Sequence, residues 1–175
     1  YSVFQIKSVD DEARIIEGIA TTPSTDRMGD IVEPKGAVFN LPIPFLWQHN
    51  ADEPIGHVTK AKPTDKGIPV RIEVVKVEEP GKLKDRLDEA WQSIQAGLVR
   101  GLSIGFKPID SEDLEDDGRS FFPPQRFTKW EWLELSLVTI PANAEATIQT
   151  IKSLERSNER RLQRTVELVS AGDGH

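Results

Sequence analysis

The sequence predicts an α+β fold whose first two thirds consist mainly of strands. Residues 69–74 alternate strictly between apolar and polar side chains, which is the period of a strand. Residues 83–94 change to a helical period, and residues 132–139 return to a strand-like pattern. The 175 residues and their apolar fraction of 37% are enough for one core. We therefore expect one domain with an appended helix.

The N-terminal strands and the helix are bounded by recognisable breakers. Residues 3–6 and 13–20 are predicted to form a hairpin joined across the polar residues 10–12. Pro80-Gly81 then ends the strand pattern, and Gly97 is well placed to end the helix. The apolar stripe of that helix comprises Leu83, Leu87, Ala90, Trp91 and Ile94.

The C-terminal part of the chain is predicted to be helical. Asn143 is a suitable N-cap, and residues 155–161 are almost wholly polar. The apolar positions of this helix are Ile148, Ile151, Leu154, Leu162, Val166 and Val169. We divide the chain into a domain over residues 1–143 and a helical segment over residues 144–175. That segment belongs to the same domain or is a tail for oligomerisation or processing.

Composition excludes several function classes. The net charge of −7 argues against a nucleic-acid partner, because phosphate binding needs clustered Lys and Arg. The absence of cysteine excludes disulfides and thiolate zinc sites. No apolar run approaches the length of a membrane span, and no signal-peptide pattern opens the chain. We expect a soluble cytosolic protein with no metal, no cofactor and no membrane partner.

The acidic residues 110–118 superficially match a calcium-binding loop. Such a loop requires a bidentate Glu at its twelfth position, and here that position is Pro124. We therefore interpret this segment as a solvated surface loop.

Ser103 lies in a Gly-x-Ser-x-Gly pentapeptide, residues 101–105, the pattern of the α/β-hydrolase nucleophile elbow. Two facts oppose that assignment. An elbow runs from strand to helix, whereas here the helix precedes the serine and a strand-like run follows it. An elbow enzyme also places its His after the Ser, and the only later one here is His175. The alternative is a glycine-flanked strand start with a small buried serine.

His49 ends an apolar run and opens a turn within residues 44–50. Leu46 and Trp47 would hold its backbone on a rigid element while the turn exposes the ring. These features make His49 the better candidate for a general base, although a turn histidine with only local hydrogen bonds fits the same pattern. His57 is the rival, as base or as third member, but its alternating surroundings predict a strand surface residue.

Glu134 is an unexpected carboxylate in a strand-like stretch. In an extended segment Leu133, Leu135 and Leu137 share one face, whereas Trp132, Glu134, Ser136 and Val138 share the other. A carboxylate among apolar residues is costly to bury unless it is paired. An imidazole N–H is a suitable partner, because the carboxylate would fix its tautomer. The alternative is a carboxylate at a sheet edge or facing Arg or Lys.

A hydroxyl, an imidazole and a carboxylate are the parts of an activated serine nucleophile. Four sequence blocks around them occur in order. They are residues 18–39, residues 44–56, residues 101–106 and residues 134–143. From about Ile16 to Ala146 the chain resembles the prohead (capsid-maturation) serine protease family of tailed bacteriophages.

The resemblance implies a mainly antiparallel β-barrel core flanked by helices, akin to the herpesvirus assembly proteases, with residues 1–143 as the protease domain. It implies Ser103 as nucleophile, His49 as general base and Glu134 as third member, with His57 as the alternative third member. It further implies an endopeptidase in the host cytoplasm, inside the immature capsid. Its substrates would be scaffold or the scaffolding segment of the major capsid protein, and often itself. Related viral proteases often self-associate, so a homo-oligomer is an open alternative.

The residues leave two other functions open. One is a non-catalytic capsid-assembly or scaffold-binding module on the same fold, which would work through the acidic loop and the polar tail. The other is an unrelated serine esterase, which would account for the pentapeptide but not for the order of His, Ser and Glu. In a protease, backbone N–H groups near Ser103, with Arg100, would support the oxyanion.

Overall fold

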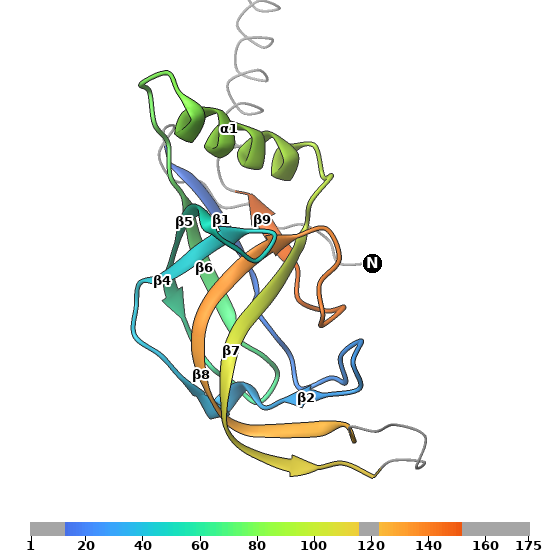
Figure 1. Ribbon diagram of the computed structural model, residues 1–175. Helices are drawn as coiled ribbons and strands as arrows, with labels where there is room; N and C mark the ends of the chain where they lie inside the picture. The colour runs from blue at the N-terminus through green and yellow to red at the C-terminus, as the bar shows by residue number, and fades with distance from the viewer. Residues whose placement is uncertain (1–12, 116–122, 152–175) are drawn as a thin grey trace, which may run out of the picture.

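The computed structural model describes residues 13–115 and 123–151 of the chain. They form one nine-stranded mixed sheet and, within these residues, one α-helix that lies across an end of the sheet (Figure 1). The elements are β1 (Arg14–Ile19), β2 (Ile31–Val32), the 3-10 turn η1 (Pro34–Gly36), β3 (Ala37–Val38), β4 (Ile43–Trp47), β5 (Asn50–Ala61), β6 (Pro69–Val74), α1 (Lys82–Gln95), β7 (Gly101–Asp113), β8 (Gln125–Val138) and β9 (Ile148–Ile151).

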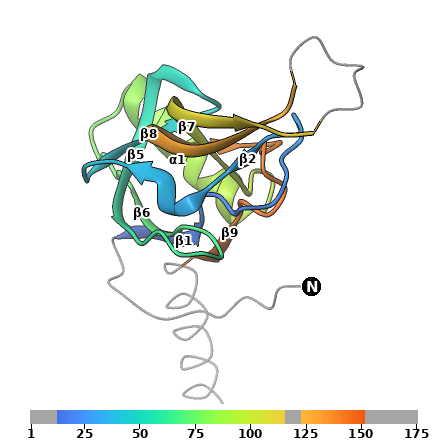
Figure 2. The ribbon, with the colours of Figure 1, turned by 90° about the horizontal axis from the view of Figure 1, so that it is seen from below.

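Strand β8 pairs with more strands than any other described strand. The strand order is β2-β8-β4-β5-β6-β1-β9, and β3 and β7 also pair with β8. Strands β2, β3 and β4 run parallel to β8, whereas β7 runs antiparallel to it along almost its whole length. Strands β7 and β8 lie side by side as a long curved ribbon in both views (Figures 1 and 2). Strand β8, which carries the carboxylate, therefore pairs both with β7, which carries the serine, and with β4, which leads into the histidine turn.

The predicted closed barrel is not found among the described residues. The start of β7 meets the residue before β9 only as an isolated bridge between Gly101 and Thr147. The Leu102 N–H donates to the carbonyl of Ala146 at 3.0 Å beside that bridge. No continuous ladder forms there among the described residues. The fold is a strand-rich mixed sheet with one helix.

The prediction of a helix after Asn143 is wrong where the structure describes the chain. Residues 148–151 are strand β9, which pairs with β1. Asn143 instead holds a turn, because its Oδ1 accepts from the N–H of Glu145 at 2.9 Å and its Nδ2 donates to the Thr22 carbonyl at 3.0 Å. Residues 152–175 and the first strand of the predicted hairpin lie outside the described residues. The division at residues 143 and 144 stays a prediction.

The predicted helix is confirmed, with one correction. Helix α1 starts directly after Gly81, and Gly97 follows its end with φ of 71°, a left-handed conformation that suits glycine. Leu83 is exposed, so it does not belong to the apolar stripe. The buried positions are Leu87, Ala90, Trp91 and Ile94. The alternation of β6 is also confirmed, since its three aliphatic side chains are buried. No helix in the described ranges is long and apolar enough to cross a membrane.

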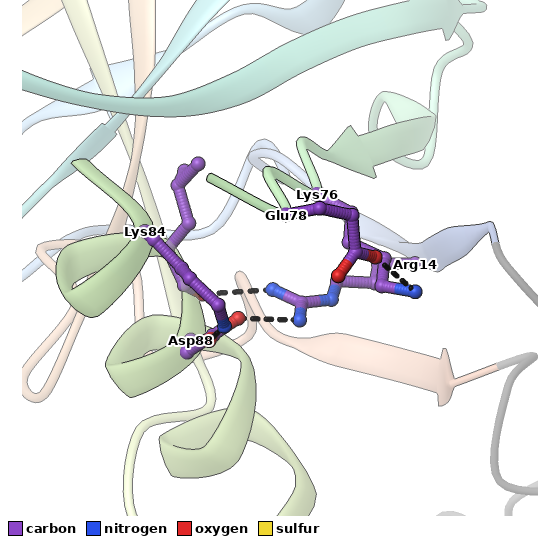
Figure 3. A network of polar contacts seen from close by, with 6 residues as sticks. Arg14, Lys76, Glu78, Lys84 and Asp88 are labelled. Atoms are coloured by element: carbon purple, nitrogen blue, oxygen red, sulfur yellow. Dashed lines mark hydrogen bonds and ion pairs between the residues drawn. The ribbon is translucent and has the colours of Figure 1, made fainter. Parts of the chain in front are cut away.

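An ion-pair network fastens β1 to α1 (Figure 3). The Arg14 guanidinium donates to the Leu87 carbonyl at 3.2 Å and to Asp88 Oδ1 at 2.5 Å. Lys84 also pairs with Asp88. The Lys84 ammonium, followed by the Arg14 guanidinium, lowers the pKa of the Asp88 carboxyl below its ordinary 3.8. Lys76 pairs with Glu78 at 2.8 Å and lowers the pKa of that carboxyl in the same way.

We expect Asp88→Asn to reduce the free energy of unfolding at neutral pH, and the reduction to vanish in acid. Because the folded-state pKa is lowered, the carboxylate stabilises the fold at every pH above its unfolded pKa, about 4. That stabilisation is lost as the pH falls from there through the folded-state pKa. Urea unfolding at neutral pH, at about pH 4 and at about pH 3 measures it. Glu89→Gln, an exposed position on the same helix, is the control. An equal effect of Asp88→Asn at all three pH values would contradict the prediction.

Candidate active site

The register of β7 and β8 places Ser103 directly opposite Ser136 and Gly105 opposite Glu134. Side chains opposite each other in an antiparallel pair point to the same face. Ser103 is 6% exposed and Ser136 is 0% exposed, so both hydroxyls lie in a nearly closed environment. The pentapeptide is the start of a strand that follows a helix. The prediction that this pentapeptide is not a nucleophile elbow is therefore confirmed.

A bulge in β8 orients Glu134. Trp132 and Glu134 both have partners on β7, but Leu133 between them has none. Leu133 is 50% exposed, whereas Trp132 is 3% and Leu135 is 0% exposed. The prediction that Leu133 shares a face with Leu135 and Leu137 is therefore wrong, and Trp132 lies in the core. The extra residue shifts the alternation by one, which keeps both flanking segments packed and turns Glu134 away from the core.

Gly105 makes room for the Glu134 side chain. A Cβ built on Gly105 would lie 2.1 Å from Oε1 and 2.7 Å from Cδ of Glu134, far inside van der Waals contact. The first glycine of the pentapeptide has a different role, since a Cβ on Gly101 would meet Pro141 Cδ at 2.7 Å and the Val138 carbonyl oxygen at 2.8 Å. Both glycines are thus required by close packing.

His49 and Gln48 form the two-residue turn between β4 and β5. Both have positive φ, 60° and 50°, as hairpin turns of type I′ require. For residues with a side chain this left-handed conformation costs on the order of 1 kcal/mol each. The end of β8 holds the turn in place. The Gln48 N–H donates to the Leu137 carbonyl at 2.9 Å, and its Nε2 donates to Thr139 Oγ1 at 3.0 Å.

The turn brings His49 onto Glu134. Nδ1 of His49 lies 2.7 Å from Oε1 of Glu134, and the two side chains are 45% and 16% exposed. An ionised carboxylate only accepts, so Nδ1 carries the proton and Nε2 remains the acceptor nitrogen. The predicted imidazole partner of Glu134 is present, and the alternative of a carboxylate facing Arg or Lys is not what the structure shows. Oε2 of Glu134 accepts from Ser136 Oγ at 2.7 Å.

His57 and Arg100 lie elsewhere in this arrangement. His57 is an exposed residue of β5, opposite Pro44 and Glu73, as its alternating surroundings predicted. Within the described part of the chain, the side chain of Glu134 hydrogen-bonds His49 and Ser136 rather than His57. Arg100 directly precedes β7, and its carbonyl accepts from the Ile148 N–H at 3.0 Å. Its suggested part in binding an oxyanion stays a prediction.

Ser103 lines a small pocket between β7 and two loops. Its cavity volume is about 40 Å³. Its walls are formed by Ala20, Thr21, Ser24, Asp26, Val32, Leu102, Ser103, Ile104, Phe106, Ala142 and Asn143. The pocket is thus a small, mostly apolar recess beside the Ser103 hydroxyl. Across the described ranges, no three His, Asp or Glu side chains are grouped to hold a metal ion.

Comparison with known proteins identifies the family. The family model for caudovirus prohead serine proteases matches residues 4–160. This chain belongs to that family. It is 65% identical over 156 residues to the capsid polyprotein of Pseudomonas phage PAJU2, covering 89% of this chain but 23% of the polyprotein. It is 29% identical to the prohead protease of Escherichia phage T5 (85% of this chain, 70% of that protein) and 30% identical to that of Enterobacteria phage HK97 (83% and 64%).

The family predicted from the four sequence blocks is thereby confirmed. Among solved structures it is similar to KSHV protease in complex with a hexapeptide phosphonate inhibitor, with a TM-score of 0.45 and 13% identity. That similarity covers 78% of this chain and 64% of that one.

The sequence patterns missed two residues of this site, Gly105 and Ser136. Gly105 is visible in the pentapeptide, but the pattern does not reveal that its missing side chain is replaced by that of Glu134. Ser136 stands two positions after Glu134, so strand periodicity alone places both on one face. That spacing is the signal that could have indicated a contact.

Proposed function

We propose that this chain is a serine endopeptidase of capsid maturation in which Ser103 is the nucleophile, His49 the general base and Glu134 the third member. The Ser103 Oγ attacks a peptide carbonyl while Nε2 of His49 takes the hydroxyl proton and then passes it to the leaving amine. Water, deprotonated by the same imidazole, releases the acyl group and restores Ser103.

One observation carries this proposal: the hydrogen bond of 2.7 Å between His49 Nδ1 and Glu134 Oε1, formed on the strand that pairs with the strand of Ser103 and two residues from the cross-strand partner of Ser103. It leaves Nε2 unprotonated and stabilises the imidazolium that forms when the serine is deprotonated. The small, mostly apolar recess lined by Ser103 is the proposed contact surface for a substrate residue. A non-catalytic assembly module would not account for a histidine held at positive φ and hydrogen-bonded to a carboxylate.

The proposed substrates are the phage major capsid protein or its scaffold, cleaved inside the assembling prohead in the host cytoplasm, and this chain itself. The 65% identical relative is a capsid polyprotein, of which this chain spans 23%. In such an arrangement the protease and capsid protein are translated as one chain, so the first cleavage would separate the enzyme from its own substrate. Self-association into a homo-oligomer stays a prediction.

Coexpression with the major capsid protein tests this function. We expect intact-mass spectrometry to show shortening of the capsid protein, or of this chain, at defined bonds. Full-length masses from an enzyme whose Ser103 reacts with a fluorophosphonate would show an active serine with another substrate, as the esterase alternative requires. Full-length masses and an unreactive Ser103, together with normal prohead assembly, would instead favour the non-catalytic assembly module.

A further inference from the structure

We propose that Ser136 is a positioning residue that fixes His49 and Glu134 relative to each other, an inference that rests on the proposed function. Its Oγ donates to Oε2 of Glu134 at 2.7 Å and accepts from the backbone N–H of His49 at 3.1 Å. One hydroxyl therefore binds the carboxylate and the main chain of the base together. The His49–Glu134 hydrogen bond closes this ring of contacts.

Burial makes this link hard to replace. Ser136 is 0% exposed, so no bulk water reaches its hydroxyl. Truncation would leave Oε2 of Glu134 and the N–H of His49 without their partners, and an unmade hydrogen bond of a buried group is more costly than a net bond is worth. Both groups would then move towards solvent, because the Glu134 and His49 side chains are partly exposed.

The backbone of the turn gives the link its importance. His49 sits at φ of 60°, which a side-chain-bearing residue adopts only when its surroundings hold it there. The Ser136 hydroxyl binds His49 itself, whereas the Thr139 hydroxyl binds only Gln48. Of these two contacts, only that of Ser136 also reaches the carboxylate.

The hydroxyl also determines which oxygen of Glu134 is left for His49. Because Ser136 donates to Oε2, Oε1 accepts from Nδ1 of His49, and this contact selects the Nδ1–H tautomer. Because the Ser136 proton is used on Glu134, this hydroxyl does not compete with Ser103, its cross-strand neighbour, for the imidazole. Ser136 thus acts on the reaction through His49 and Glu134 and touches neither substrate nor the scissile bond.

Two readouts on the full chain test this proposal. The first is the pseudo-first-order rate at which a fluorophosphonate labels Ser103, followed by intact mass; Ser103 Oγ bonds to phosphorus, fluoride leaves and the hydroxyl proton is removed by the base. We expect Ser136→Ala to slow labelling by about 100-fold, the loss typical of a misplaced catalytic group. The second is the tautomer of His49 from long-range ¹H–¹⁵N spectra, which we expect to shift from Nδ1–H towards Nε2–H.

Thr139→Val is the matched control, because it removes the hydroxyl contact to Gln48 Nε2 and does not touch Glu134. We expect it to keep the His49 tautomer and to change labelling by less than about threefold, a free-energy difference under 0.7 kcal/mol. If Ser136→Ala does not fold, Ser136→Cys, which fills the site with a slightly larger side chain and a weak thiol donor, carries the same expectation. Unchanged tautomer and labelling in a folded Ser136 variant would overturn the proposal. A wild-type chain that resists labelling but shows the Ser136-dependent tautomer would overturn the proposed function alone.

Discussion

Ser103→Ala is expected to abolish cleavage by this chain, lowering kcat by about 10⁴- to 10⁶-fold. The alanine lacks the oxygen that forms the acyl-enzyme, so only binding and any oxyanion donors remain to assist attack by water. The fold should be retained, because alanine is smaller than serine and the β7–β8 register around position 103 does not depend on its hydroxyl. Cleavage of a peptide spanning the mapped capsid site gives the rate, and thermal unfolding checks the fold.

Ser111→Ala is the matched control for this prediction. Ser111 lies on the same strand, at its exposed end, opposite Phe127. The same substitution there should leave both kcat and the unfolding temperature unchanged. Turnover at the wild-type rate by a preparation of Ser103→Ala shown by mass to be free of wild-type enzyme would mean that another residue is the nucleophile.

The chemistry of the site could be predicted from sequence better than its geometry. The pairing of His49 with Glu134 follows from local rules, since a carboxylate in an apolar strand needs a partner and a turn histidine can supply one. The bulge at Leu133 could not be read in the same way. A leucine matches a continuous alternation, and only the fit of two long strands decides that this leucine faces solvent.

The C-terminal strand shows the same limit for the fold. Asn143 followed by spaced isoleucines satisfies the rules for a capped helix. In the structure Ile148 lies in the core and β9 pairs with β1. This arrangement buries apolar surface and satisfies backbone hydrogen-bonding groups at the same time. Helix propensity is a weak preference that such tertiary pairing overrides. The barrel prediction failed close to this place, where β7 and the residue before β9 share only an isolated bridge.

Glu134→Gln measures how far kcat falls when the carboxylate of the third member is lost. A neutral amide in place of the carboxylate can donate to Nδ1 and so favour the wrong tautomer of His49, which in serine proteases lowers kcat by about 10⁴-fold. This variant is the reference for a second change that acts on the same carboxylate without altering any of the three proposed catalytic residues.

Gly105→Ala is expected to lower kcat/KM by about 10²- to 10⁴-fold, approaching the effect of Glu134→Gln. The added Cβ would occupy the place of Glu134 Oε1, which lies only 2.1 Å away, so the carboxylate has to rotate out of contact with His49. The atoms that would move belong to one side chain, 16% exposed, and have solvent to move into. We therefore expect the unfolding temperature to change little.

Gly101→Ala separates this effect from ordinary crowding. Its Cβ would meet the Val138 carbonyl oxygen and the ring of Pro141, which cannot swing aside, so we expect a lower unfolding temperature as well as lower activity. Because Gly105→Ala and Glu134→Gln remove the same interaction, the double variant should be no slower than the slower single variant, whereas independent effects would multiply. Multiplication of the two effects, or full activity of Gly105→Ala, would show that the carboxylate does not act on His49 from its place above Gly105.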